Sequence, residues 1–218
     1  MTKLISLLVL LSCGICMFCA HRKGVVLSGT VSGIDCLLAS YKHFAIFCSD
    51  SIGVVPSTLT YNLQLFKDTG FSGVILYLYP CMECHPVDQI RDVCDKIAGM
   101  LQEYRPKVLV SIEPSYFSSS KEANIRYLHL LVSAVDSETR CFSGLDIMSS
   151  RFTWNKVFGE SYHGFHLHPL YWIDLDKDPT KKGWLPFGGW ISPSEKLYEK
   201  DVTTCSNYPA GLLSYDWT

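Results

Sequence analysis

The residues best suited to chemistry stand near the end of the stretch KVLVSIEPSYF, residues 107–117. Apolar and β-branched residues lead into one acid, Glu113, and Pro114 follows it at once. A carboxyl group at the end of an apolar strand is partly desolvated, and such a group can act as a general acid near neutral pH. Glycosidases use this chemistry. The sequence therefore makes Glu113 a candidate proton donor, although an acid that forms a salt bridge at the start of a loop is the alternative interpretation.

Glycosidases also need a second carboxylate, and the position expected to supply it is Ser111. Alternate residues of a strand share a face and lie about 6.6 Å apart, so an acid at position 111 would face the same site as Glu113. A serine hydroxyl cannot carry the negative charge that supports an oxocarbenium-like transition state. Asp146 and Asp174 are the acids that could substitute, but nothing in the sequence places them near Glu113.

Two other clusters of potential ligands are weaker candidates. His166 and His168 alternate in HGFHLHP, yet zinc would need a third ligand and a fixed second shell. The acidic stretch DLDKD, residues 174–178, resembles the start of a calcium loop. Pro179 stands where such a loop needs glycine and Leu185 where it needs glutamate, so a solvated turn is expected. The sequence predicts no metal site and no cofactor.

Aromatic residues could supply the binding surface for a sugar, because aromatic rings stack on the apolar faces of sugars. Most of them are expected in the core, with two or three along a groove. The aromatic candidates for substrate binding are Tyr77, Tyr79, Tyr171 and Trp172. The last third of the chain is especially rich in aromatics: Tyr171, Trp172, Trp184, Phe187, Trp190, Tyr198, Tyr208, Tyr215 and Trp217.

The elements that must position these residues alternate along the chain. Apolar runs predict strands over 43–48, 72–81, 107–114 and 143–150, and helical spacing predicts helices over 58–70, 86–104, 119–139 and 152–159. The last 50 or so residues are less regular, with strand-like pieces over 168–175 and 211–217.

This alternation favours an α/β fold with a parallel sheet buried on both faces, either an open doubly wound sheet or a small β/α barrel. No glycine-rich phosphate loop follows the first strand, which disfavours a nucleotide-binding fold. In both architectures function lies at the carboxyl ends of the strands. That rule places residues 80–81, 113–114 and 149–150 and the region of Trp172 on one rim.

Length and composition set the broad class. The chain has 218 residues, 48% hydrophobic, which suits one domain with a substantial core. A net charge of −2 gives no reason to expect a nucleic acid as partner. Lys3, the apolar run after it and Ala20 predict a signal peptide over residues 1–20, with an uncleaved membrane anchor as the alternative. We therefore expect a secreted, extracellular monomer without a membrane contact after signal removal, and one domain over residues 21–218.

The number of cysteines is consistent with a secreted protein. Three of the ten lie in the predicted signal peptide, and in an oxidising compartment the other seven are expected to form disulfides whose pairing the sequence leaves open. Since seven is odd, one is free or pairs between chains. The CMEC stretch, residues 81–84, also fits half of a redox or zinc motif, but no second such motif accompanies it. The seven are Cys36, Cys48, Cys81, Cys84, Cys94, Cys141 and Cys205.

Several stretches, in order and spacing, resemble the secreted lysozymes of glycoside hydrolase family 25, in the nematode branch. Residues 41–46 resemble the second strand of that family, residues 62–70 and 75–81 its next helix and third strand, and residues 107–113 its fourth strand. Ile147 with residues 151–154 resembles the fifth strand and the helix after it. The stretch PFGGW, residues 186–190, is similar to a late segment of the nematode members.

The resemblance implies a flattened β/α barrel and a substrate. Members of this family hydrolyse the bond from N-acetylmuramic acid to N-acetylglucosamine in bacterial peptidoglycan, with an Asp-x-Glu motif on the fourth strand. Matched to that motif, Glu113 is the proton donor and Ser111 replaces the paired Asp. The acid of the first strand has no counterpart near residues 24–29. A tyrosine of the fifth strand near the site appears as Met148, so the resemblance makes Met148 a further candidate for substrate binding. Asp216 is a weak candidate for the acid of the last strand.

Three functions follow as hypotheses. The first is a lysozyme-like pseudoenzyme of innate defence, which binds peptidoglycan or a related glycan and whose catalysis is weak or lost. The second is an active muramidase with Glu113 as proton donor and a rearranged second carboxylate. The third is a secreted interaction protein without enzymatic activity.

Overall fold

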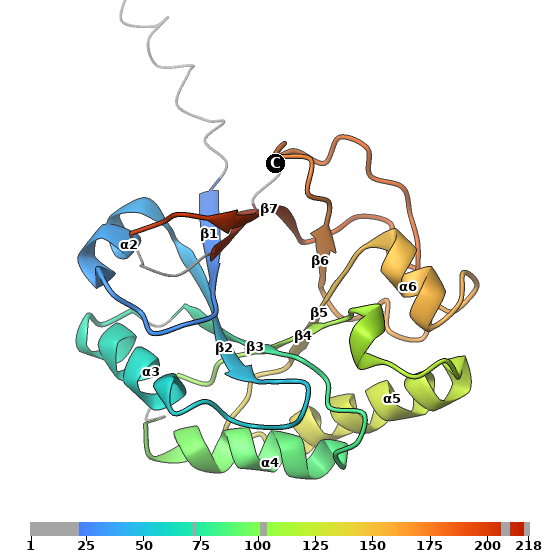
Figure 1. Ribbon diagram of the computed structural model, residues 1–218, viewed down its shortest axis with the longest axis horizontal. Helices are drawn as coiled ribbons and strands as arrows, with labels where there is room; N and C mark the ends of the chain where they lie inside the picture. The colour runs from blue at the N-terminus through green and yellow to red at the C-terminus, as the bar shows by residue number, and fades with distance from the viewer. Residues whose placement is uncertain (1–21, 72, 101–103, 206–209, 216–218) are drawn as a thin grey trace, which may run out of the picture.

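The computed structural model describes residues 22–71, 73–100, 104–205 and 210–215, and these form a closed barrel of eight strands (Figure 1). The predicted signal peptide, residues 1–20, lies outside the described residues. The single β/α barrel that the sequence predicts is thus confirmed. Its strands are β1 (Arg22–Leu27), β2 (His43–Ser49), β3 (Val74–Leu78), β4 (Val108–Ser111), β5 (Leu145–Ser149), β6 (Leu170–Ile173), β7 (Glu195–Val202) and β8 (Ala210–Tyr215).

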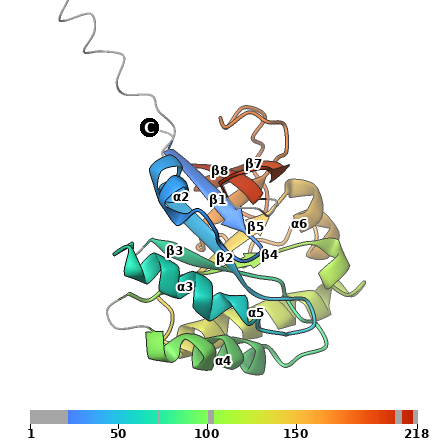
Figure 2. The ribbon, with the colours of Figure 1, turned by 60° about the vertical axis from the view of Figure 1, so that its left-hand side comes forward.

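Three of the described helices gather on one side of the barrel. In Figures 1 and 2, α3, α4 and α5 lie beside the strands from β2 to β5, whereas the described residues around β7 and β8 carry no helix. The helices are α2 (Ile34–Ser40), α3 (Thr58–Asp68), α4 (Pro86–Ile97), α5 (Lys121–Ser137) and α6 (Arg151–Val157), with short 3-10 turns η1 (Ala98–Met100) and η2 (Pro114–Tyr116).

Local sequence explains where these elements begin and end. In α4 the apolar residues at helical spacing are buried, and Pro86 stands in the first turn, where its missing N–H costs nothing. The Ser120 hydroxyl accepts a hydrogen bond from the Ala123 N–H and caps the start of α5. The strand expected over 107–114 ends as a ladder at Ser111, and Pro114, which has no N–H to donate, opens η2 instead.

Strand direction decides which residues meet at the functional end of the barrel. Each strand from β1 to β6 pairs in parallel with the next, and β8 is antiparallel to both β7 and β1. The carboxyl ends of seven strands therefore share one end of the barrel. The start of β8 lies at that end, where Ala210 pairs with Leu27, and its last residue, Tyr215, pairs with Arg22 at the opposite end.

The barrel has two apolar cores. One fills the interior and includes residues that face inward from most strands: Ala45, Ile75, Tyr77, Leu109, Met148, Tyr171, Leu197 and Leu213. The larger one lies between the strands and the covering helices and loops and contains Phe44, Leu76, Val110, Ile147 and Trp154. Because parallel barrel strands face apolar layers on both sides, their sequences are nearly continuous in apolar residues, which is why they could be predicted.

Two glycines let the 183–190 segment pack closely under α6. Gly188 and Gly189 have φ angles of 58° and 89°, in the left-handed region that side chains disfavour. A Cβ at Gly188 would lie 2.8 Å from Nε1 of Trp154, and one at Gly189 would lie 2.8 Å from Cβ of His166. The PFGGW stretch thus serves packing: Trp190 is buried against Trp154, with ring centroids 4.7 Å apart.

The region expected to be irregular contains a full strand, β7. Its sequence, EKLYEKDV, lacks an apolar run, and the strand prediction missed it. Lys196, in the middle of this charged stretch, is fully buried because it contacts the Asp176 carboxylate at 2.8 Å and the ring of Trp172 at 4.6 Å. Contacts with residues that are distant in sequence thus offset the cost of burying the lysine charge. The local sequence pattern cannot reveal such contacts.

Three disulfides join the described cysteines: Cys36–Cys205, Cys81–Cys84 and Cys94–Cys141. The odd cysteine is Cys48, which is free and buried, and burial raises the pKa of its thiol. The CMEC stretch forms its own disulfide. Within the described ranges, no helix is long and apolar enough to cross a membrane.

Candidate active site

Glu113 lies at the carboxyl end of β4, immediately before η2, with a half-buried side chain. Its Oε1 accepts a hydrogen bond from the Ser111 hydroxyl at 3.4 Å and lies 3.7 Å from the Lys200 ammonium. In the described part of the chain, the direct polar partners of this carboxylate are therefore a hydroxyl and a cation, and neither can act as the second acid of a glycosidase.

Ser111 links Glu113 to a buried tyrosine. The Tyr77 hydroxyl donates to Oγ of Ser111 at 2.9 Å, and Ser111 in turn donates to Glu113. Burial, with smaller contributions from Tyr79 and Glu113, raises the pKa of Tyr77 well above its usual value. Tyr77 therefore stays a neutral donor. This relay orients the Glu113 carboxylate, but it adds no negative charge to the site.

Aromatic rings form a wall beside Glu113. Tyr79 stands between Tyr77 and Tyr116, with ring centroids 5.0 Å and 4.6 Å away, and Phe47 lies 5.5 Å from it on the other side. Tyr79, Tyr116 and Phe47 are partly exposed, so each ring keeps some surface that a ligand could contact. Such a half-exposed aromatic wall suits the apolar face of a sugar ring.

Sequence reasoning named Tyr77 and Tyr79 but missed Tyr116, Phe47 and Lys200. Tyr116 stands three residues after Glu113, in the 3-10 turn η2 that follows it. Phe47 lies two residues after Ala45, so both side chains are on the inner face of β2. These two could have been found from strand period and spacing. Lys200 could not, since it belongs to the unrecognised strand β7.

Met148, Tyr171 and Trp172 are buried, and of these Met148 lies on the strand next to β4. Met148 pairs with Ser111 across β4 and β5 and is fully buried in the interior. Tyr171 is also buried in the interior, and the nearby acids Glu195 and Asp146 help burial to raise its pKa. Trp172 faces outward, against Trp184. The structure therefore brings Ser111, Tyr77, Tyr79 and Met148 to Glu113, and Tyr171 and Trp172 elsewhere.

The candidate replacement acids have other partners. Asp146 is buried and contacts Lys107, which precedes β4, so it belongs to the amino end of the barrel; desolvation raises its pKa, although Lys107 opposes this. Asp174 lies at the end of β6, with Oδ2 3.5 Å from Nζ of Lys196. Asp216 lies outside the described residues.

The predicted weak ligand clusters have structural contacts. Nδ1 of His168 lies 3.2 Å from the Leu145 carbonyl oxygen, and Nδ1 of His166 lies 2.7 Å from that of His163. In the acidic turn, Asp176 contacts Lys196 and Asp178 accepts from the Thr180 N–H. Across the described ranges, no three His, Cys, Asp or Glu side chains are placed to hold a metal ion.

Sequence comparison identifies related proteins. A family model described as "Lysozyme-like protein 1" matches residues 23–198. "Probable GH family 25 lysozyme 2" of Dictyostelium discoideum is 26% identical over 181 residues, which are 82% of this chain and 82% of that protein. "Lysozyme-like protein 5" of Caenorhabditis elegans is 23% identical over 201 residues, 87% of this chain and 91% of that protein.

Solved structures show the same fold at much lower identity. The muramidase of Acremonium alcalophilum superposes with a TM-score of 0.70 at 15% identity, over 91% of this chain and 95% of that one. The modular autolysin LytC of Streptococcus pneumoniae, solved with a synthetic peptidoglycan ligand, gives a TM-score of 0.70 at 10% identity, over 90% of this chain and 47% of that one.

Proposed function

Because this chain belongs to the lysozyme-like proteins of glycoside hydrolase family 25, we propose that it binds bacterial peptidoglycan and hydrolyses it weakly or not at all. Its family supports a peptidoglycan-related role. The reduced activity is inferred from the residues around Glu113.

One observation carries the proposal: the Glu113 carboxylate has Ser111 and Lys200 as its direct polar partners. Hydrolysis of a glycoside builds positive charge on the sugar in the transition state, and a second carboxylate stabilises that charge. A hydroxyl stabilises it far less, and an ammonium on the same side opposes it. Loss of such a preorganised partner commonly costs two to three orders of magnitude in rate, on the order of 3 kcal/mol.

Binding of the glycan does not need the second acid. The wall of Phe47, Tyr79 and Tyr116 stands beside Glu113 and offers apolar area to a sugar ring. A protein with this wall and without the second acid would retain the glycan and release no product, which suits a role in recognition of bacteria during innate defence.

Secretion forms part of the proposal. Three disulfides are typical of proteins that mature in an oxidising compartment, and they agree with the signal peptide that residues 1–20 predict. The mature protein would then begin near residue 21 and act outside the cell as a monomer.

Clearing of Gram-positive cell walls tests the catalytic part of the proposal. We expect wild type to clear walls slowly or not at all, and Ser111→Asp to raise the clearing rate at least about tenfold, since it restores the paired carboxylate and keeps Tyr77 as a donor. Ser111→Asn, equal in size but uncharged, is the control and should stay at the wild-type rate. Fast clearing by wild type that Glu113→Gln abolishes would instead identify an active muramidase.

A further inference from the structure

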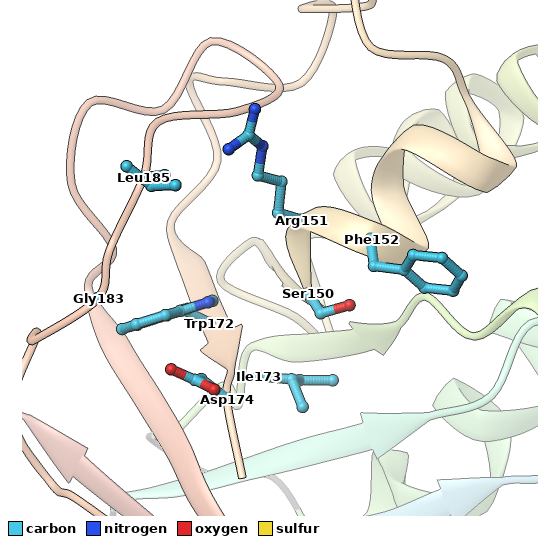
Figure 3. Close-up of a pocket in the computed structure, with 8 residues that line it drawn as sticks. All are labelled: Ser150, Arg151, Phe152, Trp172, Ile173, Asp174, Gly183 and Leu185. Atoms are coloured by element: carbon cyan, nitrogen blue, oxygen red, sulfur yellow. The ribbon is translucent and has the colours of Figure 1, made fainter. Parts of the chain in front are cut away.

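A concave site lies between α6 and the end of β6. It has a volume of about 240 Å³, and its walls come from three segments: the first turn of α6, the end of β6 and the loop after it (Figure 3). The lining residues are Ser150, Arg151, Phe152, Trp172, Ile173, Asp174, Gly183 and Leu185. We propose that this pocket binds the peptide portion of peptidoglycan, an inference that rests on the proposed function of the neighbouring site.

The position of the pocket relative to Glu113 supports this assignment. Adjacent strands lie about 4.8 Å apart, so the ends of β4 and β6, separated by β5, lie roughly 10 Å apart. α6, one wall of the pocket, packs against η2, the turn that follows Glu113. In peptidoglycan the peptide branches from the lactyl group of muramic acid. When the glycan binds at Glu113, this peptide is long enough to extend to the pocket at the end of β6.

The segment after Glu113 and the pocket helix α6 are held together by a shared hydrogen-bond partner. Asn124, fully buried on α5, donates from Nδ2 to the Ser118 carbonyl oxygen at 2.9 Å and to the Val157 carbonyl oxygen at 3.0 Å. Ser118 follows η2 and Val157 ends α6, so one side chain ties the segment after Glu113 to the helix that lines the pocket. A ligand that spans both sites would therefore meet a preorganised surface.

The chemistry of the lining fits a peptide better than a neutral sugar. Arg151 extends from α6 toward the loop that carries Leu185, and Asp174 lies across the cavity at the end of β6 (Figure 3). A guanidinium pairs with a carboxylate in a forked geometry, and an aspartate accepts from an amino group. Peptidoglycan peptides carry both groups, whereas the sugars of intact peptidoglycan are uncharged, because the lactyl carboxyl is bound in the amide link to the peptide.

Both charges remain available to a ligand. Nη2 of Arg151 lies 3.7 Å from Oε1 of Glu160, an exposed contact of the kind that contributes little. Asp174 is partly exposed, and its neighbour Lys196 lies closer to Asp176. Leu185, on the loop that faces these charges, is 57% exposed and leaves apolar surface for an alkyl side chain. The volume is below the range of about 300–1,000 Å³ that suits larger ligands, so the pocket admits a short peptide segment.

Co-sedimentation of the protein with two insoluble materials tests the inference. One is intact peptidoglycan, and the other is the same glycan after an amidase has removed its peptides. We expect wild type to bind intact peptidoglycan about tenfold more tightly, as one charge-assisted contact would give. Arg151→Glu and Leu185→Ser should each lower binding to intact material toward the level on stripped glycan and leave binding to stripped glycan unchanged.

Matched controls lie on α5, away from the pocket. Arg126→Glu makes the same charge reversal at an exposed position, and Leu130→Ser removes a leucine that is 47% exposed. Both should bind both materials as wild type does. Equal binding of wild type to the two materials, or an equal loss on both in the pocket variants, would overturn the inference and leave the proposed function standing. No retention on either material would overturn the proposed function itself and the inference with it.

Discussion

At each end of the barrel one acidic side chain contacts a lysine, and the two carboxylates differ in how deeply they are buried. Glu113 meets Lys200 at the carboxyl end, where both side chains reach solvent, and Asp146 meets Lys107 at the amino end, where the carboxylate is only 3% exposed. Attraction to a cation favours a charged carboxylate, while burial disfavours it. For Asp146, burial is the larger effect and raises its pKa above the usual 3.8.

This raised pKa predicts how stability depends on pH. A carboxyl group with a raised pKa binds its proton more tightly in the folded state than in the unfolded state, so its contribution is complete below pH 3.8 and is lost as pH rises through the raised pKa. We therefore expect the free energy of unfolding of wild type, relative to Asp146→Asn, to fall as the pH rises above 3.8 and through the raised pKa. Urea denaturation of both proteins across this range measures it.

The comparison with Asp146→Asn also controls for the other acids, because their titrations contribute equally to the free energy of unfolding of both proteins and cancel in the difference. If the ion pair with Lys107 outweighed burial, the difference would increase with pH instead. A flat difference would mean that Asp146 titrates equally in the folded and unfolded states, which also contradicts the expectation.

Residue-scale prediction from sequence succeeded where strand period was sufficient. Ser111 and Glu113 could be assigned to one face because alternate residues of a strand share a face, and the structure joins them by a hydrogen bond. Lys200 could not be assigned, since its proximity to Glu113 depends on the pairing of β7 with β6 and on irregular register between β7 and β8. Long-range strand pairing leaves no trace in local composition.

At the scale of elements, the packing under α6 depends on backbone conformation more than on side chains. Gly189 combines a positive φ with a close approach to His166, and both restrict the position to glycine.

Gly189→Ala is therefore expected to lower the free energy of unfolding by about 1–3 kcal/mol, through strain in the backbone and displacement of His166. Thermal and urea denaturation measure the change. Gly99→Ala provides the comparison, since its Cβ would meet no atom within 4 Å, and it should shift stability by less than about 0.5 kcal/mol. An equally mild effect at Gly189 would mean that the 183–190 segment can move away from the loop that carries His163 and His166.

Strands that are apolar on both faces could be predicted from the sequence, and the strand with charged residues could not. β3, β4 and β5 are buried throughout and were found, with ends that differ by a few residues. β7 was missed because Glu195, Lys196 and Glu199 give it the composition of a loop. The charges are tolerated there because His43 contacts Glu195 and two aspartates contact Lys196, and those contacts exist only in the folded chain.

At the scale of the molecule, one disulfide joins the two ends of the described chain. Cys36 in α2 is linked to Cys205, between β7 and β8, across a sequence separation of 169. The Cys81–Cys84 disulfide closes a separation of only 3. A crosslink stabilises mainly by restricting the unfolded chain, and the restriction grows with the length of the closed loop.

Replacing both Cys36 and Cys205 with Ala should lower the free energy of unfolding by about 2–5 kcal/mol. The paired substitution of Cys81 and Cys84 should cost less, and it serves as the matched comparison. Chemical denaturation under non-reducing conditions tests the order. The reverse order would indicate that the short disulfide acts through the folded rim of the barrel.

The antiparallel last strand also sets a condition on synthesis. β1 has only β2 beside it until β8 emerges from the ribosome, since Leu27 pairs with Ala210. At about 5–20 residues per second, translation of the intervening chain takes roughly 10–40 s. Throughout that interval the nascent protein presents an unpaired strand edge, the kind of surface that recruits other chains. A chaperone that shields this edge until β8 pairs with β1 would therefore raise the yield of folded protein.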